Sequence, residues 1–268
     1  MPNSEVDSSS DSPSPVLVEH RGAICILTIN RPRQSNALDP AAIKALFLSM
    51  RSAADDPEVA VVVLTGTGER SFCGGIDLKV MAAAGAQPVT ASLPGLSVLL
   101  REAFPKPIVA AVNGSAGAAG RELMLACDVI VASEHAQFGL PEVKRGLAAG
   151  RGLELLPRRV PIAVALEMAL TGDFIDANRA AAIGLVNYVV PAKSVLAEAV
   201  LLAERIARNA PLAVRFSKEK MRQACDGAQD EAADLEFLAM LNVILSSDDA
   251  REGTRAWAEG RPPVWSGR

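Results

Sequence analysis

Two glutamates, Glu122 and Glu142, stand where an acidic residue is unusual. Glu122 is followed by the apolar run LMLAC, and Glu142 follows a proline at the end of AQFGLP. A helix this apolar is largely buried, and a buried glutamate is rare unless it is paired or functional. If both carboxyls share a dry site, the pKa of one rises above its reference of about 4.3, so that one donates a proton while the other accepts. Such a pair is suited to adding or removing water.

The segment that leads to Glu122 predicts a place for negative charge. Residues 108–112 form an apolar run typical of a buried strand, residues 113–117 predict a tight turn, and residues 118–126 predict a helix. The first amides of a helix have no partner within it and lie at the positive end of its dipole. They can therefore receive a developing negative charge beside Glu122.

The same order of strand, glycine-bearing turn and helix occurs earlier in the chain. Further strands are expected at residues 129–132 and 136–138. This alternation predicts an α/β fold with its turns gathered at one edge. The earlier elements are strands over 16–19 and 23–29, a helix over 41–54 capped by Asp39, a strand over 60–64, a glycine-rich loop, and a helix that begins near Ile76.

The last third of the sequence has helical periodicity. We divide the chain into a polar, serine-rich tail over 1–15 that we expect to be disordered, an α/β core over 16–200 and a C-terminal helical region over 201–268. Helices are expected over 153–160, 163–170, 178–183, 194–208, 211–225 and 231–245, with one short strand over 186–190.

Composition narrows the class of protein. With 268 residues, 50% of them hydrophobic, the chain can bury a full core without a metal or a disulfide. The formal net charge of −4 predicts neither nucleic acid nor a membrane surface as a partner. No apolar run approaches the roughly 20 residues that span a bilayer. The four cysteines lack CxxC spacing, so we expect small buried thiols, no metal site and a cytoplasmic location.

Two other kinds of site deserve comparison. Ser115, Asp128 and His135 follow the chain order of a hydrolase triad, but the glycine of a nucleophile elbow is missing two residues before the serine. The glycines near residues 66–75 do not form a phosphate-binding motif. Gly74 and Gly75, directly before an expected helix, suit either a tight turn or close approach of a ligand to the backbone.

Four motifs in this order resemble the enoyl-CoA hydratase/isomerase family, also called the crotonase family. They are NRPRQSNAL (30–38), SFCGGIDLK (71–79), AVNGSAGAAGRELMLACDVIVA (111–132) and FGLPEVKRGLAAG (138–150), and the resemblance continues to AWAEGRPPVW near the C-terminus. It implies a crotonase (ClpP/crotonase-like) fold, a spiral of ββα units with a C-terminal helical region used for trimerisation. The expected assembly is a homotrimer, or a hexamer made of two trimers.

The resemblance also implies an acyl-CoA thioester as substrate, with coenzyme A as part of it and no separate cofactor. The backbone amides of Ile76 and Ala119 would hold the thioester oxygen as an oxyanion hole. The residues that match the family's CoA-contacting positions are Asn36, Ala37, Gly74, Gly75, Ile76, Asp77, Leu78, Lys79 and Ala119.

Both acidic positions of the family's hydratases are filled here, by Glu122 and Glu142. The resemblance therefore implies an enoyl-CoA hydratase that adds water across the 2,3 double bond, as in fatty acid β-oxidation. The alternatives are an isomerase or a dehydratase of a specialised acyl-CoA, or an acyl-CoA-binding homologue with little catalysis.

The chain departs from the family's pattern at three positions. Ala119 replaces the usual glycine, and Gly260 stands where relatives frequently have a lysine. Arg121 is a charge where a small or apolar residue is usual. It is expected either to form a salt bridge to a neighbouring helix or, if it lies near the site, to hold a glutamate ionised.

Overall fold

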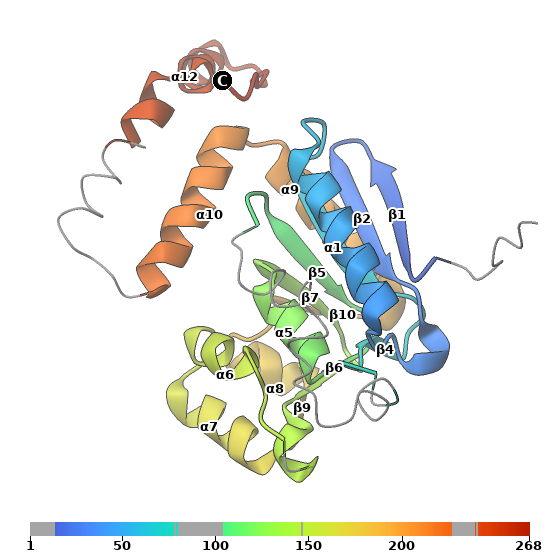
Figure 1. The fold of residues 1–268 in the computed structure, drawn as a ribbon. Helices are drawn as coiled ribbons and strands as arrows, with labels where there is room; N and C mark the ends of the chain where they lie inside the picture. The colour runs from blue at the N-terminus through green and yellow to red at the C-terminus, as the bar shows by residue number, and fades with distance from the viewer. Residues whose placement is uncertain (1–13, 78, 80–103, 146, 227–238, 240) are drawn as a thin grey trace, which may run out of the picture.

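The computed structural model describes residues 14–77, 79, 104–145, 147–226, 239 and 241–268 (Figure 1). Three expectations therefore lie wholly or mostly outside the described residues: the tail, the CoA contact at Leu78 and the helix over 231–245.

A six-stranded sheet forms the centre of the molecule, in the order β1-β2-β3-β5-β7-β10. β1 is antiparallel to β2, and every other pairing is parallel. Parallel strands are covered on both faces, which explains their continuous apolar sequences. The strands are β1 (Val16–Arg21), β2 (Ile24–Ile29), β3 (Val61–Gly66), β5 (Ile108–Val112), β7 (Val129–Ser133) and β10 (Tyr188–Val190).

Helices pack on both faces of this sheet (Figure 1). Helix α9 (Val195–Ala207) buries its apolar stripe against alternate residues of β2, β3 and β5. The opposite face packs against α1 (Pro40–Asp55) and α5 (Ala119–Ala126). Asp39 caps α1 as expected, since its Oδ1 accepts a hydrogen bond of 2.8 Å from the amide of Ala42.

A second sheet of four short strands supports the start of α5. Its order is β4-β6-β8-β9, made of β4 (Ser71–Cys73), β6 (Ser115–Gly117), β8 (Gln137–Gly139) and β9 (Phe174–Asp176). The prediction of a simple turn over 113–117 is wrong, because Ser115–Gly117 pairs with both β4 and β8. Small residues suit a turn locally, but these pairings between distant segments decide the conformation.

The helices of the last third mostly confirm the periodicity. Further helices are α6 (Gly152–Leu155), α7 (Ile162–Thr171), α8 (Ala177–Ala182), α10 (Pro211–Asp226) and α12 (Asp248–Glu259). The single helix expected over 153–160 is instead α6 followed by the 3-10 helix Leu156–Arg158, with a proline in its first turn. Strand β9 was not predicted.

The α/β fold class is confirmed by this arrangement of mixed sheets and covering helices. The division into domains stays a prediction, and residue 200 lies inside α9. No helix in the described part of the chain combines the length and the apolar composition that crossing a bilayer requires.

Candidate active site

The loop after β4 lies directly against the start of α5. A Cβ atom at Gly120 would be only 2.0 Å from the carbonyl oxygen of Cys73, so this contact requires glycine. Gly75 has a φ of +99°, and a Cβ there would lie 2.8 Å from the Cβ of Ala118 and 3.3 Å from the amide nitrogen of Ala119. Two glycines thus allow two distant backbone segments to touch.

Two amides remain open where these segments meet. Ala119 is the first residue of α5, and no side chain caps this helix. Ile76 lies three residues before Lys79, which is helical, and forms a β-bridge with Leu38 whose hydrogen bonds use the amides of Leu38 and Asp77. Among the described residues, the amides of Ile76 and Ala119 have no hydrogen-bond acceptor. A pair of free N–H groups is what an oxyanion hole needs.

Ala118, the residue before α5, has a strained backbone. Its φ of 49° and ψ of −132° lie in a region that glycine adopts readily and L-residues rarely adopt.

We expect Ala118→Gly to raise the free energy of unfolding by about 1 kcal/mol, because the relieved strain exceeds the added freedom of the unfolded chain. Urea unfolding measures this change. Ala197→Gly, at an exposed position inside α9, is the control, and its free energy of unfolding should fall by about 1 kcal/mol. If the free energy of unfolding fell equally in the two variants, the backbone of Ala118 would not be strained.

Glu122 lies in the first turn of α5 with only 6% of its surface exposed. Its Oε1 accepts a hydrogen bond of 2.9 Å from the amide of Gly152. Burial raises the pKa of Glu122, and the charge of Glu142 raises it further, while the Gly152 hydrogen bond and the charge of Arg121 oppose the rise. A carboxyl in this position can hold a proton above the usual pH range of a glutamate.

Glu142 lies in the 3-10 helix Pro141–Arg145 and is half-buried. Its charge acts on both Glu122 and Arg121, so the fold gathers three ionisable side chains into one region. The buried position of the Glu142 carboxyl oxygen Oε2 also keeps it from water. The two acids that the sequence suggested as a pair therefore interact.

Arg121 is fully buried, and the expected salt bridge to a neighbouring helix does not form among the described residues. Within that part of the chain, none of its three guanidinium nitrogens has a hydrogen-bond partner. Burial lowers the pKa of Arg121 to about 10, while the charges of Glu142 and then Glu122 act in the opposite direction. The side chain is therefore still a cation at neutral pH.

The expected CoA-contacting residues lie along the loops next to Ile76. Asn36 is buried, and its side-chain amide donates to the carbonyls of Ser71 (2.6 Å) and Thr67 (3.1 Å). Its side chain thus holds the loop together. Ala37 beside it is half-buried.

The amide of Gly74 donates to the carbonyl of Ser35 over 2.9 Å. Asp77 accepts from Arg31 (3.3 Å) and from the amide of Lys79 (3.1 Å), and Lys79 itself is exposed. A ligand contact at any of these residues stays a prediction.

The sequence analysis did not identify residues 150–152, at the start of α6, as neighbours of Glu122. Gly150 and Gly152 leave room for its carboxylate, since a Cβ at either glycine would lie 3.4 Å from Oε1. The positive charge of Arg151 between them also lowers the pKa of Glu122. The glycines in GRG, soon after Glu142, were the available signal.

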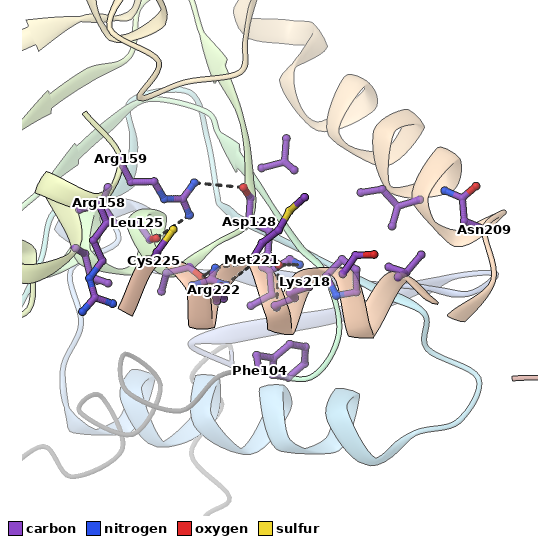
Figure 2. A pocket seen from close by; sticks show the side chains of 18 of the residues that line it. Phe104, Leu125, Asp128, Arg158, Arg159, Asn209, Lys218, Met221, Arg222 and Cys225 are labelled. Atoms are coloured by element: carbon purple, nitrogen blue, oxygen red, sulfur yellow. Dashed lines mark hydrogen bonds and ion pairs between the residues drawn. The ribbon is translucent and has the colours of Figure 1, made fainter. Parts of the chain in front are cut away.

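The hydrolase triad does not form. His135 has 76% of its side chain exposed and lies near Glu134. Asp128 instead binds Lys218 (2.8 Å) and Arg222 (2.7 Å) of α10. Figure 2 shows Asp128, Lys218 and Arg222 beside a pocket. This pocket has a volume of about 900 Å³, and its lining includes residues of α10, the C-terminal end of α5 and Arg151. The ion pairs around Asp128 attach α10 to the core.

Metal and thiol chemistry receive no support from the described residues. No group of three His, Cys, Asp or Glu side chains there is placed to hold a metal ion. Cys25, Cys73 and Cys127 are buried as expected, whereas Cys225 is exposed. Burial raises the pKa of Cys73 and Cys127 to about 12, so both stay protonated.

Comparison with known proteins agrees with this geometry. The chain matches the enoyl-CoA hydratase/isomerase family over residues 19–268. It is 38% identical to the (E)-benzylidenesuccinyl-CoA hydratase of Thauera aromatica, over 94% of this chain and 99% of that protein. It is also 38% identical to the 2,3-dehydroadipyl-CoA hydratase of Escherichia coli, over 95% of this chain and 100% of that protein.

The solved structures show the same fold. The crystal structure of an enoyl-CoA hydratase from Mycobacterium marinum superimposes with a TM-score of 0.87 at 42% identity, over 95% of this chain and 100% of that one. The architecture is therefore the crotonase fold expected from the motifs, and this chain belongs to the enoyl-CoA hydratase/isomerase family.

Proposed function

We propose that this protein is a hydratase of a 2-enoyl-CoA thioester. The observation that carries the proposal is the interaction of Glu122 with Glu142 in a region shielded from water. The open amides of Ile76 and Ala119, at the start of the same helix as Glu122, add the means to stabilise negative charge.

In the proposed reaction the thioester oxygen accepts hydrogen bonds from the amides of Ile76 and Ala119. One ionised glutamate takes a proton from water, and the hydroxide oxygen bonds to C3 of the acyl group. The electrons of the double bond move toward the thioester oxygen, where the two amides hold the enolate charge. The other glutamate, which carries a proton, delivers it to C2, and the charge on the oxygen is lost.

The relatives suggest that the acyl group carries a second functional group. Benzylidenesuccinyl-CoA and 2,3-dehydroadipyl-CoA, the substrates named for two relatives, are both more elaborate than a plain fatty acyl-CoA. We include a substituted enoyl-CoA in the proposal. The reverse reaction, dehydration of a 3-hydroxyacyl-CoA, uses the same groups by microscopic reversibility.

The site also leads us to propose that an acyl-CoA binds without a separate cofactor. A homotrimer, or a hexamer of two trimers, remains the proposed assembly, which light scattering of the purified protein measures directly.

A turnover assay tests the function. The protein is incubated with 2-enoyl-CoAs of increasing chain length and with 2,3-dehydroadipyl-CoA, and loss of the conjugated enoyl absorbance is followed. Mass spectrometry of the product should show the addition of one water. An isomerase would give a product of unchanged mass, and a binding protein would give saturable affinity for the enoyl-CoA without turnover; either result would contradict the proposal.

A further inference from the structure

The amide of Ile76, one of the two donors proposed for the thioester oxygen, shares a peptide group with the carbonyl of Gly75. In a trans peptide group the N–H and the C=O lie in one plane and point in opposite directions. Whatever holds the carbonyl oxygen of Gly75 therefore also aims the amide of Ile76. That oxygen accepts a hydrogen bond of 2.7 Å from the amide of Leu38.

The amide of Leu38 is held in the same way, by Arg31. It shares a peptide group with the carbonyl of Ala37, and the guanidinium nitrogen Nη1 of Arg31 donates a hydrogen bond to this carbonyl. A continuous chain of hydrogen bonds thus runs from the cation of Arg31 through two peptide groups. It ends at the amide of Ile76, which is open to a ligand.

Two carboxylates fix the guanidinium group itself. Its Nη2 atom lies 2.8 Å from Oδ2 of Asp39 and 3.3 Å from Oδ2 of Asp77. Asp39 caps α1, and Asp77 directly follows Ile76, so the guanidinium joins the two segments that form the bridge. Only 15% of the Arg31 side chain is exposed, and screening of its charge by water is therefore weak.

A cation at the beginning of this chain changes the last donor in it. Hydrogen bonds from a charged donor are stronger than neutral ones, and each bond in a chain polarises the next. The Arg31 charge draws electron density toward the carbonyl of Ala37, which makes the amide of Leu38 a better donor. The same effect at the carbonyl of Gly75 makes the amide of Ile76 a better donor.

We propose that Arg31 is a positioning residue that aims and polarises the amide of Ile76 through these two peptide groups. This inference rests on the proposed hydratase function, because that reaction places negative charge on the thioester oxygen. Arg31 does not touch the substrate in this role. It acts through a backbone donor, whose hydrogen bond matters most when the oxygen carries the enolate charge.

The first measurement is turnover of an enoyl-CoA that the wild type hydrates. In Arg31→Met, we expect kcat to fall by about 10- to 100-fold, less than for complete loss of an oxyanion-hole donor because the amide is still present. KM should change less than kcat, since the donor acts mainly in the transition state. Arg31→Lys keeps a charge and a donor and should retain more of kcat than Arg31→Met.

Arg21→Met is the control for this series. It removes an arginine that forms an exposed ion pair of 2.6 Å with Glu19, on β1. Its kcat should equal that of the wild type.

A second measurement is independent of turnover. Butyryl-CoA is a saturated thioester that cannot be hydrated, and a ¹³C label at its thioester carbonyl separates this band from those of the protein in infrared difference spectra. Hydrogen bonds to the carbonyl oxygen lower its stretching frequency. We expect a lower frequency on the wild type than in water, a partial return toward the value in water on Arg31→Met, and an intermediate value on Arg31→Lys.

A merely structural role of Arg31 predicts a different outcome. Loss of folded protein would weaken the band of the bound thioester without changing its frequency. An unchanged frequency in Arg31→Met, or an unchanged kcat, would overturn the proposal. If Arg31→Met does not fold, Arg31→Gln, which removes the charge but keeps a polar side chain, is judged by the same two results.

The two proposals fail in distinguishable ways. If the wild type lowers the carbonyl frequency of butyryl-CoA but hydrates no enoyl-CoA, the proposed function is wrong, while the frequency in the Arg31 variants still decides the role of Arg31. If the wild type leaves the frequency unchanged, the amides of Ile76 and Ala119 do not form an oxyanion hole, and both proposals are wrong.

Discussion

Replacing either Glu122 or Glu142 with glutamine is expected to lower kcat for hydration by about 10²- to 10⁴-fold. Glutamine keeps the size and most of the hydrogen bonding of glutamate but can neither accept nor release the transferred proton. Each acid serves a different half of the addition, so the glutamate that remains in either single variant cannot sustain hydration by itself. Turnover of an enoyl-CoA that the wild type hydrates measures both effects.

Stability provides the control for Glu122→Gln. Burial is the main cause that raises the pKa of Glu122 in the folded state, so the folded protein binds this proton more tightly than the unfolded chain does. As pH rises above the unfolded value, the ionised carboxylate increasingly costs stability. Glu122→Gln should therefore unfold at a temperature at least as high as the wild type near neutral pH, with its advantage shrinking toward acidic pH.

Glu167→Gln is the matched control for activity. Glu167 is an exposed acid that pairs with Arg179, on α7 and α8, so its variant should hydrate the substrate at the wild-type rate. Full activity in Glu122→Gln or Glu142→Gln would remove that residue from the proposed chemistry.

Gly75→Ala is expected to lower kcat by about 10²- to 10³-fold, the usual loss when one oxyanion-hole donor is removed. The new methyl group would lie 2.8 Å from the Cβ of Ala118 and 3.3 Å from the amide nitrogen of Ala119. Both contacts are too close, so the start of α5 must move away from the loop that carries Ile76. The two amides then no longer act on one oxygen atom.

Gly68→Ala separates this steric effect from backbone strain. Gly68 also has a positive φ, +84° against +99° at Gly75, but a Cβ at Gly68 would meet no atom within 4 Å. The control should lose stability to a similar degree while keeping kcat. Thermal unfolding and turnover of the two variants, measured side by side, distinguish strain from displacement of the amides.

The double variant Gly75→Ala/Ala118→Gly tests the proposed cause. Removing the Ala118 methyl group eliminates the 2.8 Å contact and also relieves the positive φ at that residue. We expect kcat to recover at least partly relative to Gly75→Ala alone. An unchanged kcat would show that the clash between the two Cβ atoms is not responsible for the loss.

Local sequence patterns predicted those elements whose conformation depends on near neighbours. The apolar strands, the Asp39 cap and the start of α5 at Ala119 follow from apolar runs, helix capping and glycine-bearing turns, all of which act within a few residues. Strand β6 and the bridge at Ile76 could not be predicted this way, because each exists only through pairing with a segment far along the chain.

The same division applies to the candidate site. The sequence by itself predicted the two acids and the free amides at the start of α5, because an acid within an apolar helix and amides at a helix start are local features, whereas the amide of Ile76 as an oxyanion-hole donor was predicted from the resemblance to the family. Only the tertiary structure decided that Glu142 acts on Glu122, that Gly152 donates a hydrogen bond to Glu122, and that Arg121 is buried with no hydrogen-bond partner among the described residues. Burial and electrostatic interaction depend on distances between segments, and these distances are set when β4, α5 and the segment around Gly152 pack together.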